Sequence, residues 1–261
     1  MRATIDQVCR YWDARPCNVR HGQAAVGTLE WSQQVTARKY LVEPHIPGFA
    51  QFARWRGKRV LEVGCGIGTD TLEFLRAGAN VHAVDASMKS IRLAWQRCFA
   101  EKVGLYLDRE DDVVFHPYDA EEFLPPGPFD LAYSFGVLHH TPRPDRVLKN
   151  IYDRLAPGGE LRVMLYARHS LKFWFGEQPE AQPDCPVVKL YTAWSARKLL
   201  QAAGFEVLGV RKTHLFPWRV KDYVTHRYVR RWPYRLMPPW LFHGLEQLAG
   251  HHLLVVARRS A

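Results

Sequence analysis

Residues 60–70 read VLEVGCGIGTD, a short apolar run that contains one acidic residue and leads into three glycines at every second position. Such a run is typical of a buried strand, and the TDTLEFLRAGA stretch that begins at Thr69 has the apolar spacing of one helix face. A glycine turn between a strand and a helix lies where open α/β sheets bind ligands and where helix N–H groups point at the site. The stretch therefore predicts a ligand-binding turn.

The turn departs from two common phosphate-binding patterns. Counted from Gly64, the dinucleotide fingerprint G-x-G-x-x-G requires a third glycine at the position of Thr69. A P-loop requires Gly-Lys-Ser/Thr after the turn, and this chain has none there. The glycines thus favour neither a nicotinamide dinucleotide nor a nucleoside triphosphate.

Strands and helices alternate along most of the chain. Strands are predicted at residues 59–64, 81–87, 113–123, 129–140 and 159–167, after Gly204, and at 251–259. The stretches between them have helical patterns, and Ser87 is the expected N-cap of the second of these helices. Residues 28–55 also suit helices, with a break at Pro44 and Pro47. The alternation predicts an α/β fold with a mostly parallel sheet and helices on both faces.

The composition is that of a globular protein. The chain has 261 residues, of which 47% are hydrophobic and 24% charged, enough to bury a substantial core. The N-terminus has no apolar leader, and no window holds the roughly eighteen uninterrupted apolar residues that a membrane span requires. We therefore expect a cytoplasmic protein without a transmembrane segment.

The five cysteines form no CxxC pair and are odd in number. This pattern indicates free thiols, and we expect no metal site.

The positive charge is concentrated in one segment. The net charge is +10, and residues 211–235 hold eight Lys or Arg against Asp222 alone, which is +7 of that total. The basicity must therefore be explained for this segment and not for the whole chain.

Further acidic positions and motifs follow the turn in order. Asp85 ends the second predicted strand and Asp119 follows the third, before FDLAYSFGVLHH (129–140) and LAPGGELRV (155–163). Together with EVGCGIG (62–68), these stretches resemble the motifs of class I S-adenosylmethionine-dependent methyltransferases. In detail they are most similar to the small-molecule branch, of the ubiquinone/menaquinone or methyltransferase-11 type. The resemblance covers about residues 59–211 and the last strand.

The resemblance implies a Rossmann-like fold in which a seven-stranded, mostly parallel sheet has an antiparallel last strand. Outside that core we expect an N-terminal helical arm at residues 1–55 and an insertion at residues 212–250, between strands six and seven. The core itself then comprises residues 56–211 and 251–261.

The resemblance also implies that the cofactor is S-adenosyl-L-methionine, with S-adenosyl-L-homocysteine (SAH) as product. Glycines allow close approach of the cofactor to the backbone, and the two oxygens of Asp85 suit ribose hydroxyls. Asp119 suits the adenine amine, Ala120 a ring nitrogen, and Met88 the adenine face. Glu62 can either orient the turn or meet the α-ammonium group of the cofactor. The expected cofactor-binding residues are Glu62, Gly64, Cys65, Gly66, Gly68, Asp70, Asp85, Ala86, Met88, Asp119, Ala120, Ser134 and Phe135.

Three side chains near the end of the fourth strand are candidates for a general base, namely Tyr133, His139 and His140. A sulfonium methyl is already activated, so alignment of the acceptor supplies much of the rate and a base is optional. Histidines in the HHTP sequence also commonly cap the following helix or pack in a wall. The sequence leaves both roles open.

Substrate recognition is expected from the parts outside the common core. The candidate residues are Trp12, Arg15, Arg20 and His21 in the arm, Trp174 in residues 167–188, and Trp218 and Tyr223 in the insertion. Aromatic residues interleave with the basic cluster there, which suits a lid over an anionic or extended substrate. A structural cover or dimer patch is the alternative, and the oligomeric state stays open between monomer and homodimer.

We predict methyl transfer to a small or medium-sized metabolite in biosynthesis, at an O, N, S or C acceptor. Two other hypotheses stay open. An RNA methyltransferase could use residues 211–235 to contact RNA, although no separate RNA-binding module is visible and nucleic acid is not the expected partner. The second hypothesis is a protein that binds S-adenosylmethionine and does not catalyse a reaction.

Overall fold

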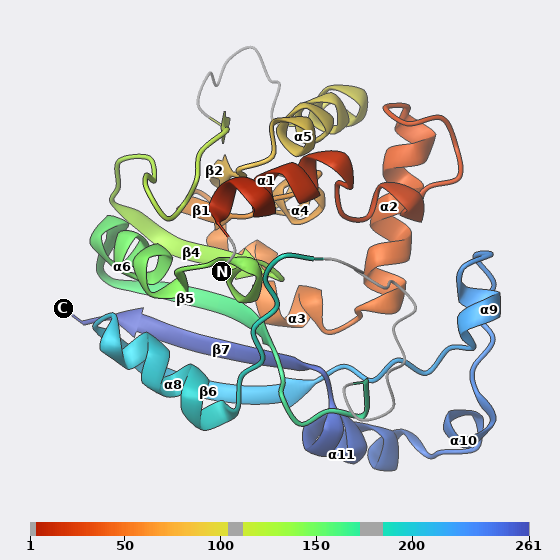
Figure 1. The fold of residues 1–261 in the computed structure, drawn as a ribbon. Helices are drawn as coiled ribbons and strands as arrows, with labels where there is room; N and C mark the ends of the chain where they lie inside the picture. The colour runs from red at the N-terminus through yellow and green to blue at the C-terminus, as the bar shows by residue number, and fades with distance from the viewer. Residues whose placement is uncertain (1–3, 104–111, 173–184, 261) are drawn as a thin grey trace.

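The computed structural model describes residues 4–103, 112–172 and 185–260. A single sheet with the strand order β3-β2-β1-β4-β5-β7-β6 runs through the molecule (Figure 1). The strands are β1 (Arg59–Val63), β2 (Asn80–Val84), β3 (Val113–His116), β4 (Phe129–Phe135), β5 (Leu155–Tyr166), β6 (Phe205–Thr213) and β7 (His252–Arg259).

Strand directions confirm the predicted topology. β1 pairs in parallel with β2 and β4, β2 with β3, and β4 with β5. β7 is antiparallel to both of its neighbours, β5 and β6. The carboxyl ends of β1, β2, β3, β4 and β5 therefore meet at one edge of the sheet.

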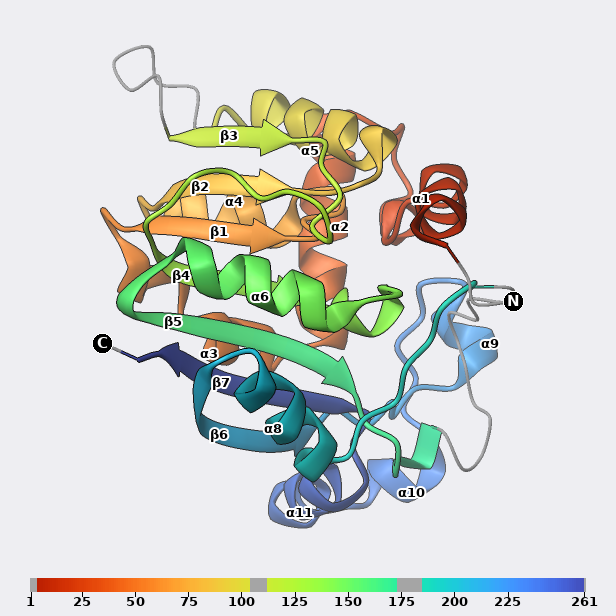
Figure 2. The same ribbon diagram turned by 60° about the vertical axis from the view of Figure 1, so that its left-hand side comes forward.

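Helices cover both faces of the sheet, as Figure 2 shows. One face carries α6 (Pro144–Arg154) and α8 (Ala193–Ala202), and the other carries α3 (Ile46–Ala50), α4 (Thr69–Arg76) and α5 (Met88–Glu101). Side chains of β1 alternate between the layers, since Leu61 and Val63 pack in the first core and Val60 in the second. Burial on both faces explains the nearly continuous apolar strands.

Several strands begin or end at other residues than predicted. β4 ends at Phe135 because Gly136 adopts a φ of +83°, and residues Leu138–His140 form a short 3-10 helix, η3. β3 ends at His116, directly before Pro117, which has no N–H to continue the ladder. β5 starts earlier than predicted because Leu155 already pairs with Phe129.

The N-terminal part forms α1 (Ile5–Ala14), the 3-10 helix η1 (Val19–His21), α2 (Leu29–Val42), and η2 (Phe52–Trp55) after α3. Trp31 and Val35 of α2 are fully buried against Ile67 of the glycine turn. The arm is thus packed directly onto the ligand-binding turn. Pro47 was expected to break a helix but lies in the first turn of α3, where its missing N–H costs nothing.

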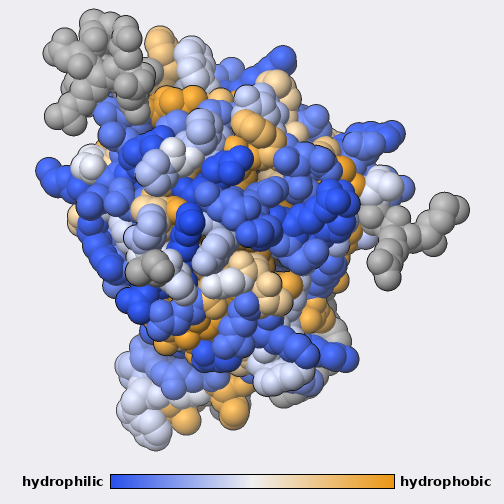
Figure 3. Space-filling view, turned by 90° about the vertical axis from the view of Figure 1, so that its left-hand side faces the viewer, coloured by the Kyte–Doolittle hydropathy of each residue, from blue (hydrophilic) through white to orange (hydrophobic). Residues whose placement is uncertain are grey.

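The insertion between β6 and β7 contains α9 (Val220–Tyr223), α10 (Trp232–Arg235) and α11 (Pro239–Ala249). These helices lie beside the edge of the sheet where the parallel strands end (Figure 1). Hydrophilic residues cover most of the face at the opposite edge, with apolar residues scattered among them (Figure 3). Within the described ranges, none of the helices combines the length and the apolar character needed to span a lipid bilayer.

Candidate active site

A cavity of about 440 Å³ lies at the carboxyl ends of the parallel strands. This volume falls in the usual range for small-molecule sites. The wall is built from parts of the chain that are distant in sequence. They are the N-terminal arm, the glycine turn with the ends of β2 and β3, the end of β4 with the segment after it, the end of β5 with the residues that follow, the insertion, and the start of β7.

The three glycines of the turn have different physical roles. All three have positive φ, +77° at Gly64, +55° at Gly66 and +74° at Gly68. A Cβ on Gly64 would lie 2.1 Å from a methyl of Val137, and one on Gly68 would lie 2.8 Å from the Cβ of Ala94. A Cβ on Gly66 would meet no atom within 4 Å, because this residue borders the cavity. Gly66 thus keeps open a space that a ligand can fill.

Asp85 holds the turn and borders the same cavity. Its Oδ2 accepts from the backbone N–H of Gly66 at 2.8 Å, and its Oδ1 accepts from Ser87 N–H at 2.8 Å. Burial raises its pKa to about 6, and the two N–H donors lower it in part. Each oxygen still has a free lone pair for a further donor, such as a hydroxyl group.

Asp119 and Ala120 line the cavity beside Tyr118. Asp119 Oδ1 accepts from the backbone N–H of Glu121 at 2.9 Å, and burial raises the pKa of this carboxyl. The side chain of Asn150 in α6 donates to the carbonyl of Ala120 at 2.9 Å, which fixes the peptide that follows Ala120. The fold therefore holds the Asp119–Ala120 loop in place.

Eight of the predicted cofactor-binding residues line the cavity, and five do not. Those in its wall are Gly64, Cys65, Gly66, Asp85, Ala86, Asp119, Ala120 and Phe135. Those outside it are Glu62, Gly68, Asp70, Met88 and Ser134. Met88 is 43% exposed, and Ser134 is buried with its hydroxyl donating to Val63 O at 2.9 Å.

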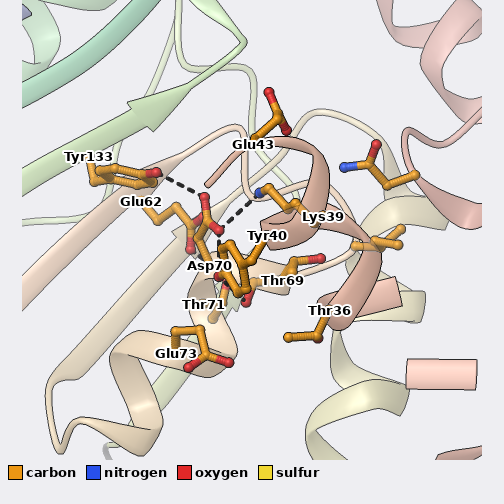
Figure 4. A network of polar contacts seen from close by, with 12 residues as sticks. Thr36, Lys39, Tyr40, Glu43, Glu62, Thr69, Asp70, Thr71, Glu73 and Tyr133 are labelled. Atoms are coloured by element: carbon orange, nitrogen blue, oxygen red, sulfur yellow. Dashed lines mark hydrogen bonds and ion pairs between the residues drawn. The ribbon is translucent and has the colours of Figure 1, made fainter. Parts of the chain in front are cut away.

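Asp70 is the centre of a buried polar network rather than part of the cavity wall (Figure 4). Its Oδ1 pairs with Lys39 Nζ at 2.9 Å and accepts from Tyr40 Oη at 2.8 Å. Its Oδ2 accepts from Tyr133 Oη at 2.9 Å. Burial opposes the charge on Lys39, yet Asp70 and Glu43 raise the pKa of this lysine.

The contacts of Tyr133 and Glu62 bear on two of the expected roles. Tyr133 is fully buried, its hydroxyl donates to Asp70, and burial raises its pKa well above the usual range, so it does not serve as a base facing the cavity. Glu62 lies under the turn, where it accepts from Thr71 Oγ1, and burial raises its pKa to about 8. Glu62 therefore orients the turn and the start of α4 rather than the ligand.

Arg97 of α5 ties the turn to α2, and sequence patterns did not reveal it. The side chain is fully buried and donates to the carbonyl of Ile67 at 3.0 Å and to Thr69 Oγ1 at 2.7 Å. It also donates to Ser32 Oγ at 2.7 Å and Thr36 Oγ1 at 2.7 Å, both on α2. Arg97 thus couples the N-terminal arm to the site.

The structure separates the two histidines of η3. His140 lines the cavity, whereas His139 is fully buried and its ring stacks on Tyr166 with centroids 3.6 Å apart. His140 Nδ1 lies 2.8 Å from the carbonyl oxygen of Val187. A carbonyl can only accept, so Nδ1 carries the hydrogen and Nε2 carries the lone pair.

The lone pair of His140 forms no hydrogen bond with the described residues. Its Nε2 is buried and has no hydrogen-bond partner among the described residues. Burial lowers the pKa of His140 to about 4, so the ring is neutral at pH 7. The ring of Trp12 packs edge-on against it at 5.2 Å and fixes its plane. His140 is therefore a neutral proton acceptor at the cavity wall.

Only some of the predicted substrate residues line the cavity. Trp12, His21 and Tyr223 line the cavity. Arg15 and Arg20 are exposed and do not border it. Trp218 packs within the insertion, against Tyr228 at 5.5 Å, and Trp174 lies outside the described residues.

The insertion reaches across the cavity to the N-terminal arm. Arg38 of α2 stacks over the Tyr223 ring at 4.4 Å and donates to the Tyr223 carbonyl at 3.2 Å. Insertion residues in the cavity wall are Leu215, Phe216, Tyr223, Arg231, Tyr234 and Ala249. The two segments outside the common core therefore close the cavity together.

A group of histidines in this wall was missed by sequence reasoning. His214, His251 and His252 line the cavity, and His45 lies directly behind, with its Nε2 3.1 Å from His252 Nδ1. Burial lowers the pKa of His45 to about 4, of His251 to about 2, and of His214 and His252 well below the usual range. The sequence shows the His251–His252 pair, but its pattern predicts only a strand there and no role at the site.

The chain is similar in sequence to known methyltransferases. The sequence model of a family described as "Methyltransferase domain" matches residues 37–210, well over half of the 261-residue chain. An uncharacterized protein of Synechococcus sp. is 39% identical over 111 residues, which cover 42% of this chain and 25% of that protein. The ubiquinone biosynthesis O-methyltransferase of Ralstonia nicotianae is 35% identical over 105 residues, covering 40% of this chain and 42% of that enzyme.

This chain thus spans less than half of the length of either curated relative. Among solved structures, magnesium protoporphyrin IX methyltransferase from Synechocystis PCC 6803 with bound SAH has a TM-score of 0.63 at 17% identity. The match covers 98% of this chain and 100% of that one. At this identity the similarity concerns the fold, and it agrees with the Rossmann-like arrangement of the sheet.

Proposed function

The chain belongs to the methyltransferase-domain family, and from this premise we propose that it transfers a methyl group from S-adenosyl-L-methionine to a small or medium-sized metabolite. One observation carries the proposal. Gly66 and Asp85 border the same cavity as the neutral acceptor nitrogen of His140. The residues proposed to bind the methyl donor and the histidine proposed to act on the acceptor therefore line one cavity.

The residues present fit the cofactor. The open space beside Gly66 admits a group close to the backbone, and Asp85 offers acceptor lone pairs for the two ribose hydroxyls. Asp119 offers an acceptor for the adenine amine, on a loop that Asn150 holds. When bound, S-adenosylmethionine supplies an activated methyl group.

His140 then defines the acceptor chemistry. A neutral imidazole with its lone pair toward the cavity can take the proton of a hydroxyl group as that oxygen gains the methyl group. The bond between Nδ1 and Val187 O holds the ring in the tautomer that this step requires. We therefore favour a hydroxyl-bearing acceptor, such as a phenol, over an acceptor that needs no proton removal.

We propose that the chain is organised as a core of residues 56–211 and 251–261, a cap of residues 1–55 and a substrate lid of residues 212–250. Support comes from the contact between Arg38 and Tyr223, which joins cap and lid over the cavity. Lid residues Arg231 and Tyr234 reach the cavity wall and suit an anionic or extended substrate.

The proposal is tested by titrating the purified chain with S-adenosylmethionine and with SAH in a calorimeter, followed by a screen of phenolic acceptors for SAH release. We expect micromolar binding of both cofactor forms and turnover with at least one phenol. A chain indifferent to both cofactor forms would refute the central claim, and binding without turnover on any acceptor would favour a non-catalytic protein. RNA affinity that falls steeply with salt would instead favour the RNA alternative.

Binding of SAH should weaken in acid. The pKa of Asp85 is raised to about 6, so its carboxylate is ionised above that pH and loses an acceptor as pH falls through it. At pH 5 about one tenth of this group remains ionised, which predicts a Kd about tenfold higher than at pH 7.5. Calorimetry at the two pH values measures the change, and equal Kd values in the wild-type chain would contradict it.

Replacement of His140 by alanine should slow turnover of a phenolic acceptor by about 100-fold. The Kd for SAH should stay within about twofold, because His140 faces the acceptor half of the cavity. Steady-state rates with the best acceptor of the screen measure the effect, and His116→Gln on β3 serves as control. If kcat of His140→Ala matches that of the wild type while the acceptor is a phenol, the assignment of this base is wrong.

A further inference from the structure

Three histidines from separate parts of the chain converge beside the cavity. His45 precedes α3, His214 follows β6, and His252 begins β7. One ring nitrogen of each lies within 4.8 Å of the corresponding nitrogens of the other two. The ring centroids are 5.3 Å apart for His45 and His214, 5.2 Å for His45 and His252, and 4.4 Å for His214 and His252.

We propose that His45, His214 and His252 bind a divalent transition-metal ion of the Zn²⁺ type in the cavity wall. Zinc takes three imidazole nitrogens at about 2.1 Å, which places pairs of ligand atoms roughly 3.4 Å apart in tetrahedral geometry. The observed distance of 3.1 Å between His45 Nε2 and His252 Nδ1 is close to this value. A modest rotation of the rings brings the third nitrogen to a common centre.

The backbone positions one of the three imidazoles. His214 is held in a left-handed conformation, with φ of +70°, by the bond from His251 N–H to its carbonyl at 2.9 Å. The backbone therefore directs this ring to a defined place.

Charges around the cluster act in both directions. Glu43 Oε1 lies 3.7 Å from His252 Nδ1 and supplies a negative charge beside the proposed ion. The positive charges of Arg211 and Lys172 act on these rings and oppose an ion. Lys39 is paired with Asp70, so its charge is compensated. Strong ligation by three nitrogens must therefore exceed this repulsion.

The site borders the cavity, because His214, His252 and Glu43 are all in its wall. A fourth coordination position directed there would take an anionic oxygen, such as a phenolate. This part of the inference rests on the proposed function and deepens it. The ion would hold such an acceptor in the cavity that His140 also lines.

The test uses the full chain without a histidine tag, freed of metal by dialysis against EDTA and then titrated with Co²⁺. We expect one Co²⁺ per chain with visible d–d absorption bands, and displacement of these bands by one equivalent of Zn²⁺. His214→Asn, which tolerates positive φ, and His45→Gln should each weaken Co²⁺ binding by at least about 100-fold. A second pair of contacting histidines, His82 and His116, is 3.0 Å apart on β2 and β3, so His82→Gln is the matched control and should bind as the wild type does.

Two results would overturn the metal site. One is a wild-type chain without a stoichiometric Co²⁺ site, and the other is His214→Asn and His45→Gln variants that are folded by circular dichroism and still bind Co²⁺ normally. Addition of salicylate should shift the bands, and unchanged bands would refute the open position toward the cavity. Calorimetry with SAH on the metal-free chain tests the proposed function separately, so failure of either idea can be told from failure of the other.

Discussion

Replacing Asp85 by alanine is expected to weaken binding of S-adenosylmethionine by about 100-fold or more. Two hydrogen bonds to a charged acceptor contribute about 1.5–3 kcal/mol each, and each 1.4 kcal/mol is a factor of ten in Kd. The variant also releases Gly66 N–H, which Asp85 holds at 2.8 Å, so the turn itself loosens. Calorimetry with S-adenosylmethionine and SAH measures the loss.

The matched control for this variant is Asp130→Ala. Asp130 is a carboxylate at the start of β4, and it accepts from Arg59 N–H at the opposite edge of the sheet. It should change Kd by less than about twofold. An Asp85→Ala variant that binds SAH as tightly as Asp130→Ala would remove Asp85 from the site.

Loss of binding in Asp85→Ala should not arise from unfolding. The folded-state pKa of Asp85 is raised above its ordinary value, so its ionised form opposes folding above pH 6 and removal of the charge takes away no stabilising charge. We expect the thermal midpoint of the cofactor-free variant at pH 7.5 to stay near that of the wild type. A midpoint lowered by more than 10 °C would mean that the hydrogen bonds of Asp85 outweigh its burial.

Replacing Asp70 by asparagine is expected to lower the free energy of unfolding by about 3–5 kcal/mol. The change leaves the buried ammonium of Lys39 without its carboxylate, and an unpaired buried charge costs that amount. Tyr40 and Tyr133 each donate to an oxygen of Asp70, so one of their bonds is lost as well. Denaturant unfolding followed by circular dichroism measures the loss.

Two further variants isolate the cause. Asp153→Ala breaks the exposed pair between Lys149 and Asp153 at 2.8 Å, and it should cost no more than about 1 kcal/mol. The double variant Lys39→Met/Asp70→Asn removes both charges and should recover most of the stability lost in Asp70→Asn. If Asp70→Asn loses no more than Asp153→Ala, the network does not stabilise the fold.

The sequence was sufficient for the fold and for part of the cavity wall. The spacing of apolar residues marked all seven strands, and the glycine turn with Asp85 and Asp119 marked positions that line the cavity, because these features depend on neighbours in sequence. Strand ends were less accurate, since they depend on backbone events such as the positive φ of Gly136. Asp70 was assigned to the ligand because its position fits a pattern, whereas the fold directs it into the protein.

The acceptor half depends on contacts that no local pattern records. His45 and His252 are 207 positions apart, and Arg38 and Tyr223 are 185 apart. These pairs meet because β7 lies between β5 and β6 in the sheet. The insertion that joins β6 to β7 therefore lies beside α2 and the start of α3. The sequence by itself therefore determined the sheet and the glycine turn that borders the cavity, through periodicity and glycine geometry. Only the tertiary structure decided which histidine presents a free lone pair and which three share a centre, because burial and distance between remote side chains arise when the chain closes.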